Sequence, residues 1–460
     1  MRGFLASSVG VTCAAALALP LALPAPAQAG PSTVTAAAAA PGSTQSLPLV
    51  PLTGERALGP AAPEQGVTRR DVRPFSLVGV VWDDPNSELN GRVQVRTRGT
   101  GTGHWSDWQD VETHNDEHAA DPDTPEGKSR RVHGSTAPLW VGDSDGVEVR
   151  VDADKAAPGV AASPGERRAT APVASSLPGG LRLELVDPGG DPPRPDARTT
   201  GRAGGAPSGV RAKGVRAGAP DGDSGTGRKT GATEVTALSR EETERAYFPD
   251  DMAEQRTMPY IGPRPRIITR RGWGANENLR ERGFVYTKSV KAAFVHHTAS
   301  GNKYSCSQVP SIIRSIYRYH VVSSGWRDIG YNFLVDKCGN IYEGRAGGVA
   351  KAVMGAHTRG FNTNSMGIAV IGSFGRTKPT DAALKAISRL TAWKLGLYGA
   401  NPRGKTYLKS AGGNLYRKGK NVRLNVISGH RDGFATECPG RLLYGKLGSA
   451  RTTAARYQGR

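Results

Sequence analysis

One segment of the chain limits the possible folds more than any other. Between residues 189 and about 257 apolar residues nearly vanish, and Gly, Pro, Arg, Asp and Thr dominate. A segment without apolar side chains cannot bury a core, so residues 189–258 are predicted to be a flexible linker between two folded regions. The whole chain of 460 residues is only 37% hydrophobic and has 60 Gly and 32 Pro, which also indicates much linker.

The first 73 residues are not expected to fold. Residues 1–29 combine one Arg, an apolar run and Ala27-Gln28-Ala29, which is the layout of a signal peptide with its cleavage site. Prolines 20, 24 and 26 interrupt the run and argue against a transmembrane anchor. Residues 30–73 are rich in Ala and Pro and predict disorder. The protein is therefore expected to be secreted, with no transmembrane segment after removal of the signal peptide.

Residues 74–188 show the alternation of apolar and polar residues that is typical of strands. The runs FSLVGVVW, RVQVRTRG, PLWVGDSDGVEVRVDAD and LRLELVD are separated by clusters of Gly, Asp, Asn and Pro. Short antiparallel strands with such turns predict a β-sandwich-like accessory domain. Within it, His114 and His118 have a spacing that binds metal on a helix, but the surrounding Asp, Pro and Gly predict a loop. In a loop this spacing fixes no geometry, so no metal role is expected for these two residues.

Residues 259–447 predict a second domain of the α/β class. Strand-like runs occur at 292–297, 331–339, 366–374 and 424–430, and helical patterns lie between them, in SQVPSIIRSIYRYHVVS and PTDAALKAISRLTAWKL. Alternating strands and helices indicate a central mixed sheet flanked by helices. Residues 448–460 are expected to be a C-terminal tail.

Two runs at strand ends carry residue types suited to metal chemistry. AAFVHH ends in His296 and His297, and ISGHRDGFATECPG contains His430 and Cys438. Two imidazoles and one thiolate are the kind of three-ligand set that a catalytic zinc site uses, with a fourth position left open. Cys13 is lost with the signal peptide, so an odd number of cysteines remains. If Cys438 does not pair, Cys306 and Cys338 form the disulfide.

Four blocks in a fixed order give the domain a family resemblance. FVHHTAS, GWRDIGYNFLVDKCGNIYEGR, GAHTRGFNTNSMGIAVIG and GHRDGFATECPG resemble the family of peptidoglycan recognition proteins and phage-lysozyme-type amidases, and RRGWGA at 270–275 resembles its entry segment. The resemblance implies that one Zn²⁺ is held by His296, His430 and Cys438. It also implies that Tyr331 faces the attacking water and that Thr436 lies beside the site. Binding-only members often lose the cysteine, which this chain keeps.

The resemblance implies a reaction and a substrate. The expected function is that of a zinc-dependent N-acetylmuramoyl-L-alanine amidase, which cuts the amide between the lactyl group of N-acetylmuramic acid and L-alanine of the peptidoglycan stem peptide. A zinc ion in such a site acidifies a water molecule and polarises the carbonyl, and Tyr331 and Thr436 are candidates to stabilise the oxyanion. Tyr331 is preferred for assisting the nucleophile, with Glu437 as the alternative. The alternative function is peptidoglycan binding without turnover.

Other polar residues receive supporting roles. His297 alternates with His296 along the strand and is expected to pack or support the site, and His320 is expected to be a hydrogen-bonded core residue. His357 is a candidate to line the substrate groove, and Arg345 and Arg359 are candidates to bind stem-peptide carboxylates. Wall-glycan docking, inhibition of the catalytic domain and binding of another protein remain open as roles for residues 74–188.

The net charge restricts the partners. A formal charge of +20 implies an anionic partner, and for an exported protein peptidoglycan and anionic wall polymers are the expected ones. Nucleic acid is not expected, because no nucleic-acid-binding motif accompanies the charge and export removes access. The protein is expected to be a monomer in the cell wall or outside the cell.

Overall fold

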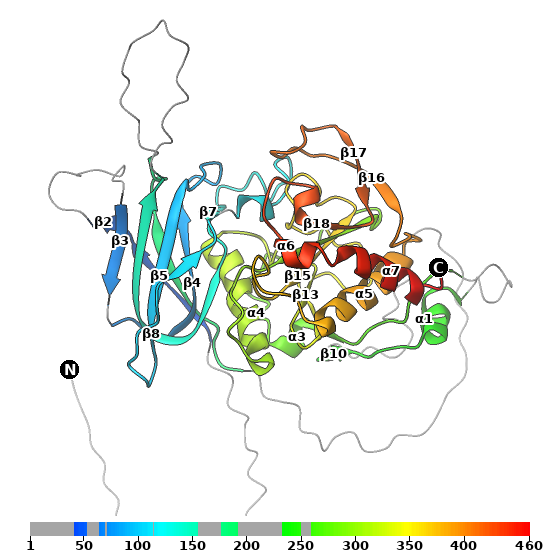
Figure 1. Ribbon diagram of the computed structural model, residues 1–460, viewed down its shortest axis with the longest axis horizontal. Helices are drawn as coiled ribbons and strands as arrows, with labels where there is room; N and C mark the ends of the chain where they lie inside the picture. Colours follow the sequence, from blue (N-terminus) through cyan, green and yellow to red (C-terminus); the bar gives the residue numbers. More distant parts are fainter. Residues whose placement is uncertain are drawn as a thin grey trace, which may run out of the picture. The chain divides into compact units, whose positions relative to one another are not determined.

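The computed structural model describes residues 41–52, 64–69, 71–113, 115–154, 176–191, 232–249 and 259–460. The expected signal peptide, most of the expected linker and His114 lie outside the described residues. All described residues belong to one compact unit, Ala39–Arg460. Within it a β-rich part is followed along the chain by an α/β part (Figure 1).

The accessory domain is built from one nine-stranded sheet. Six of its strands follow the order β1-β9-β4-β8-β3-β2. In addition, β5 pairs with β8 and β6, and β7 pairs with β4. The strands are β1 (Ser43–Pro48), β2 (Val50–Pro51), β3 (Glu64–Arg69), β4 (Phe75–Trp82), β5 (Gly91–Gly99), β6 (Gln109–Val111), β7 (Gly134–Ser135), β8 (Leu139–Ala153) and β9 (Arg182–Asp187). A short 3-10 helix, η1 (Asp116–His118), lies between β6 and β7.

The prediction of disorder for residues 30–73 is wrong for its described parts. Strand β1 pairs with β9 over six residues, and β3 pairs with β8 over six residues. Both strands are stabilised by backbone hydrogen bonds to their partners, although their own side chains are mostly polar. Amino-acid composition indicates which side chains can be buried but not which backbone groups pair. It therefore fails to predict polar strands that are stabilised by backbone hydrogen bonds.

Strand β4 is buried on both faces, which explains its nearly continuous apolar sequence. Val78 and Val80 pack in the core of the accessory domain. Leu77 and Val81 point the other way and pack with Ile312 and other residues of the α/β part. A strand covered on both faces has no solvent face to keep polar, so the run FSLVGVVW needs no alternation.

The α/β domain is built on a mixed seven-stranded sheet, as predicted. Its order is β10-β11-β14-β13-β15-β12-β18. The strands are β10 (Glu234–Val235), β11 (Ile267–Ile268), β12 (Ala292–His297), β13 (Phe333–Val335), β14 (Ile341–Glu343), β15 (Ser365–Val370) and β18 (Ile427–Gly429). A separate hairpin joins β16 (Lys405–Lys409) to β17 (Asn421–Asn425). The helices are α1 (Arg240–Tyr247), α3 (Arg270–Trp273), α4 (Val309–Arg318), α5 (Asp381–Gly396), α6 (Arg441–Tyr444) and α7 (Leu447–Tyr457).

Helices cover both faces of this sheet. Val295 of β12 and Ile368 of β15 share one core with Ile387 of α5 and Ala454 of α7. On the other face, Leu334 and Ala369 pack with the apolar stripe of α4. Helix α5 begins where the sequence predicts, because the Thr380 side chain accepts a hydrogen bond from the Ala383 amide as an N-cap. The predicted disulfide Cys306–Cys338 is confirmed.

Two predicted domain limits are wrong. The expected tail is largely helix α7, whose residues Leu447, Ala450 and Ala454 are buried in the core. The expected linker contains α1, which has a capping box at Ser239 and buries Tyr247 beside Trp393, with 6.1 Å between the ring centroids. Both helices are short and polar outside one apolar stripe, so their composition resembles that of a linker. No helix of the described residues is long and apolar enough to cross a membrane.

Candidate metal centre

Two neighbouring parallel strands bring the candidate histidines together. Strand β18 pairs in parallel with β12. His296 lies near the carboxyl end of β12, and His430 follows β18 directly in the 3-10 helix η5 (His430–Asp432). Parallel strands end at the same edge of a sheet, so the two rings meet, with 4.5 Å between their centroids. Both side chains are fully buried.

Cys438 reaches the same point from the loop after η5. Its Sγ lies 3.8 Å from Nδ1 of His296 and accepts a hydrogen bond of 3.4 Å from the backbone amide of His297. The thiol is buried and is the free cysteine of the described residues. The three residues that the sequence proposed as ligands therefore converge on one point.

A fourth candidate ligand comes from the accessory domain. His118, in η1, places its Nε2 3.6 Å from Sγ of Cys438. Its ring centroid lies 4.6 Å from that of His430 and 5.3 Å from that of His296. One ligand atom from each of the four residues lies within 4.8 Å of the others. The sequence-based expectation that His118 has no place near a metal site is therefore corrected.

The four residues fit a zinc ion in spacing and chemistry. Two ligands of a tetrahedral zinc lie roughly 3.5 Å apart, given bonds of about 2.0–2.3 Å, and the sulfur-to-nitrogen distances here are 3.6 and 3.8 Å. Neither ring nitrogen of His430 makes a hydrogen bond of standard geometry among the described residues, although the ring is fully buried and interacts with the Glu117 backbone. A buried polar atom without a partner is costly, and coordination to a cation would satisfy it.

Burial sets the protonation of these groups. It lowers the pKa values of His118, His296 and His430 well below 6.5, so the rings are neutral and each keeps a lone pair. Burial also raises the pKa of the Cys438 thiol well above its usual value. A dication would reverse that preference, because it stabilises a thiolate directly.

Tyr331 lies next to the cluster in the segment before β13. Its ring centroid is 5.6 Å from that of His296 and 5.8 Å from that of His118. The side chain is buried, and burial raises the pKa of its phenol well above 10. The phenol is therefore protonated at any physiological pH and can donate a hydrogen bond.

Thr436 lies two residues before Cys438 and contacts the accessory domain. Its Oγ1 accepts a hydrogen bond from the Cys438 amide at 3.0 Å and donates one to Oε1 of Glu117 at 2.7 Å. The alternative proton carrier Glu437 points elsewhere. Its carboxylate is exposed and pairs with Arg431 at 3.0 Å.

His357 is corrected from a groove residue to a buried support of the site. The side chain is fully buried, its ring lies 5.2 Å from that of His296, and its Nδ1 is 3.0 Å from Oγ1 of Thr358. Gly367 passes so close that an added Cβ would lie 2.4 Å from the His357 ring. The loop that carries His357 therefore packs against the candidate ligand His296. The sequence pattern of a loop does not reveal such burial.

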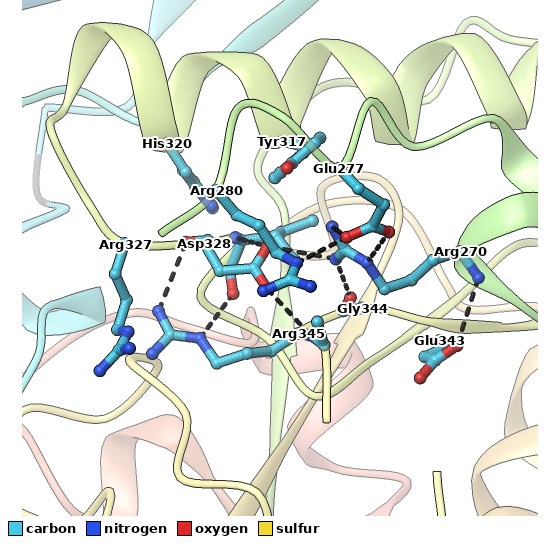
Figure 2. A network of polar contacts seen from close by, with 12 residues as sticks. Arg270, Glu277, Arg280, Tyr317, His320, Arg327, Asp328, Glu343, Gly344 and Arg345 are labelled. Atoms are coloured by element: carbon cyan, nitrogen blue, oxygen red, sulfur yellow. Dashed lines mark hydrogen bonds and ion pairs between the residues drawn. The ribbon is translucent and has the colours of Figure 1, made fainter. Parts of the chain in front are cut away.

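Arg345 is buried and paired with a carboxylate of the protein itself. Its Nη1 and Nη2 each donate to Glu126 of the accessory domain, both at 2.9 Å, and its Nε donates to the Ile329 carbonyl at 2.8 Å. Figure 2 shows it beside Asp328 and Arg270, which are joined by a hydrogen bond of 3.1 Å. These bonds hold the guanidinium in place, and the Arg345 backbone amide donates to the Tyr331 carbonyl at 2.8 Å.

The other three assigned residues take secondary positions. The backbone amide of Arg359 donates to the Glu117 carbonyl at 2.8 Å, and the side chain is half-buried. The His297 ring belongs to the opposite face of β12 and stays outside the ligand cluster, while its amide supports the Cys438 sulfur. His320 makes the hydrogen bond expected of a core histidine, accepting from the Gly330 amide at 3.3 Å.

Sequence reasoning missed two residues of the site, His118 and Glu117. Both are buried, in a loop that is otherwise rich in residues typical of solvent. A histidine gives no periodic signal when its partners lie about 180 or more residues away along the chain. The only available signal was the histidine-acidic segment THNDEH itself.

Comparisons with known proteins match the two regions that supply the site residues. The family described as N-acetylmuramoyl-L-alanine amidase matches residues 286–441, and the family described as Rv3811 N-terminal galactose-binding domain-like matches residues 29–173. Peptidoglycan-recognition protein SC1a of Drosophila melanogaster is 31% identical over 192 residues, which cover 41% of this chain and 87% of that protein. The chain belongs to the peptidoglycan recognition protein and amidase family.

Further relatives of this family match the same region. Peptidoglycan-recognition protein SC2 of Drosophila simulans is 29% identical over 181 residues, covering 39% of this chain and 84% of that protein. Among solved structures, wild-type Drosophila PGRP-LB is 27% identical with a TM-score of 0.32, covering 40% of this chain and 93% of that one. The two family matches show that this chain carries a galactose-binding-like accessory domain followed by a domain of the amidase family.

The buried histidines predict that the stability of the protein depends on pH. Burial, with a smaller contribution from Arg345, lowers the pKa of His357 and of His320 to about 3. In the unfolded chain these rings take up a proton near pH 6.5. Below pH 6.5 the unfolded state therefore binds more protons, and the free energy of unfolding falls by up to about 1.4 kcal/mol per pH unit for each ring until about pH 3.

The check compares urea unfolding of the metal-free protein and of His357→Gln between pH 8 and pH 4.5. Below pH 6.5 the free energy of unfolding of His357→Gln should fall less steeply with pH than that of the parent, by up to about 1.4 kcal/mol per pH unit. His104→Ala, at an exposed position, serves as the control variant. Equal slopes for the parent and His357→Gln would contradict the prediction.

Proposed function

We propose that the protein is a secreted zinc-dependent N-acetylmuramoyl-L-alanine amidase. It hydrolyses the amide between the lactyl group of N-acetylmuramic acid and L-alanine of the peptidoglycan stem peptide. The observation that carries the proposal is the convergence of His296, His430 and Cys438 at the ends of β12 and β18, beside Tyr331. Secretion is proposed from residues 1–29, and contact with anionic wall polymers from the net charge of +20.

The residues divide the work of hydrolysis among them. His296, His430 and Cys438 would hold the zinc ion, which when bound supplies Lewis acidity and an activated water. The His297 amide supports the sulfur through its hydrogen bond, and this keeps Cys438 oriented toward the imidazoles. The His357 ring packs behind His296 and fixes its position.

Tyr331 and Thr436 are proposed to stabilise the transition state. Attack of water on the amide carbon places negative charge on the carbonyl oxygen, and donors fixed in a buried site stabilise that charge best. The phenol of Tyr331 is such a donor, because burial keeps it protonated. The hydroxyl of Thr436 is a second donor once it no longer donates to Glu117. The bond between carbon and nitrogen then breaks, the amide nitrogen takes up the proton that the attacking water gives up, and the stem peptide leaves with a free amine.

The test is a product analysis on a defined muropeptide. The mature full-length protein is reconstituted with zinc and incubated at high protein concentration with the muropeptide. The products are identified by mass spectrometry. We expect a stem peptide with a free L-alanine amine and a sugar with a free lactyl carboxylate. A chelator should stop their formation, and added zinc should restore it.

The alternative is a peptidoglycan-binding protein without turnover. The names of the matched relatives, which are peptidoglycan-recognition proteins, favour it, whereas the retained ligand Cys438 favours catalysis. Binding of the muropeptide without any cleavage, in protein that holds one equivalent of zinc and has an accessible site, would select the alternative.

A further inference from the structure

One loop of the accessory domain occupies the candidate site. We define the plug as residues 115–126, which include η1 and lie between strands β6 and β7. On one side it is anchored in its own domain, where Asn115 Nδ2 donates to Ser135 Oγ at 3.2 Å. On the other side it enters the α/β domain, where His118 joins the ligand cluster.

The plug contacts the groups assigned to the reaction. His118 Nε2 faces the Cys438 sulfur at 3.6 Å, in the position of a fourth ligand. The neighbouring Glu117 accepts the hydrogen bond of the Thr436 hydroxyl at 2.7 Å. Both side chains are buried, with 5% of His118 and 2% of Glu117 exposed. With the plug in place, water and substrate have no access along this side of the cluster.

Carboxylates of the plug also engage Arg345 and the loop that carries Arg359, the two residues assigned to stem-peptide carboxylates. Both terminal nitrogens of Arg345 donate to Glu126 at 2.9 Å, in a pair whose two side chains are each 4% exposed. Oδ1 of Asp121 accepts hydrogen bonds from the Gly360 amide and the Asn362 side chain, both at 2.8 Å. The plug thus offers carboxylates where the carboxylates of a stem peptide were expected to bind.

An apolar contact between the accessory domain and helix α4 lies beside these interactions. Leu77, Val81 and Trp140 of the accessory domain share one apolar core with the helix α4 stripe. The Tyr319 hydroxyl donates to the carbonyls of Val80 and Thr136 across this contact, at 3.3 and 3.1 Å. The packed interface therefore adds to the plug's own contacts in holding it at the site.

We propose that the plug is a built-in inhibitory segment, in which His118 is the fourth zinc ligand and Glu117, Asp121 and Glu126 occupy substrate contacts. The proposal rests on the proposed function. Structural zinc sites have four protein ligands, whereas catalytic ones keep one position open. The full-length protein is accordingly latent, and it becomes active when the accessory domain withdraws the plug. Of the three roles left open for residues 74–188, this selects inhibition of the catalytic domain.

The test uses full-length protein reconstituted with Co²⁺ for spectroscopy and with Zn²⁺ for turnover. His118→Ala should change the visible cobalt spectrum, because a solvent ligand replaces an imidazole, and it should weaken metal binding at least about tenfold. If the plug is seated in more than nine molecules of ten, His118→Ala should raise kcat/KM on a defined muropeptide at least about tenfold. His104→Ala, an exposed histidine of the same domain, should change none of these quantities.

A second variant keeps the proposal testable if His118→Ala disturbs the fold. Glu126→Gln leaves the candidate ligands intact and weakens the pair with Arg345, so it should raise kcat/KM with a smaller change in metal affinity. An unchanged cobalt spectrum and metal affinity in His118→Ala would overturn the ligand assignment whatever the turnover. Equal kcat/KM in the parent and both variants, with measurable turnover in all, would overturn the latency.

The failure of the proposed function would look different. In that case His118→Ala would change the cobalt spectrum and the metal affinity as expected, which supports the ligand assignment. The parent and both variants would then release no stem peptide, although the site is open and metal-loaded. That pattern would reject the hydrolase while keeping His118 in the metal centre.

Discussion

Cys438→Ser is expected to remove stoichiometric zinc and to lower hydrolysis of a muropeptide by at least about a thousandfold, or roughly 4 kcal/mol of transition-state stabilisation. Serine does not ionise near neutral pH, so it offers zinc no anionic ligand. The fold should persist, because a serine hydroxyl can still accept the hydrogen bond that the His297 amide donates to the sulfur. The change therefore separates metal binding from folding.

The measurement is best made in the His118→Ala background, where the proposed plug no longer masks turnover. Metal content by mass spectrometry and kcat/KM on a defined muropeptide are compared before and after Cys438→Ser. Ser428→Ala in β18 serves as the control, because it changes one buried hydroxyl near the site and should keep the zinc. Retention of one equivalent of zinc with unchanged turnover in Cys438→Ser would refute the assigned ligand set.

The sequence predicted the elements that depend on local patterns. Strand β12 has the predicted limits, Ala292–His297, because four apolar residues bounded by polar ones are a strong local signal. Helices α4 and α5 follow their apolar stripes. The meeting of His296 and His430 follows from two parallel strands that end at the same sheet edge, which the family resemblance supplied.

The residues that the accessory domain contributes to the site could not be predicted from the sequence. His118 contacts Cys438, which lies 320 positions further along the chain, and Glu126 contacts Arg345 at a separation of 219. Such contacts depend on how the two domains pack against each other, and this packing produces no periodic pattern in the sequence of either domain. The same reason explains Arg345, which looked like a substrate ligand because its partner carboxylate lies in another domain.

Glu126→Ala is expected to destabilise the folded protein by about 3–5 kcal/mol. The substitution leaves the Arg345 guanidinium buried without its main partner, and an unpaired buried charge costs about that much. Because the pair joins the two domains, the loss should appear as an earlier unfolding transition of the accessory domain. Urea unfolding followed by tryptophan fluorescence measures it.

The matched control is an exposed ion pair between the same domains. Arg131 pairs with Glu281 at 2.5 Å, with 62% and 42% of the side chains exposed. Surface pairs contribute about 0–1 kcal/mol because water screens them, so Arg131→Ala should cost little. The double variant Glu126→Met with Arg345→Met should recover most of the loss, since it removes both buried charges. If Glu126→Ala cost no more than Arg131→Ala, the buried pair would contribute nothing measurable to holding the plug in place.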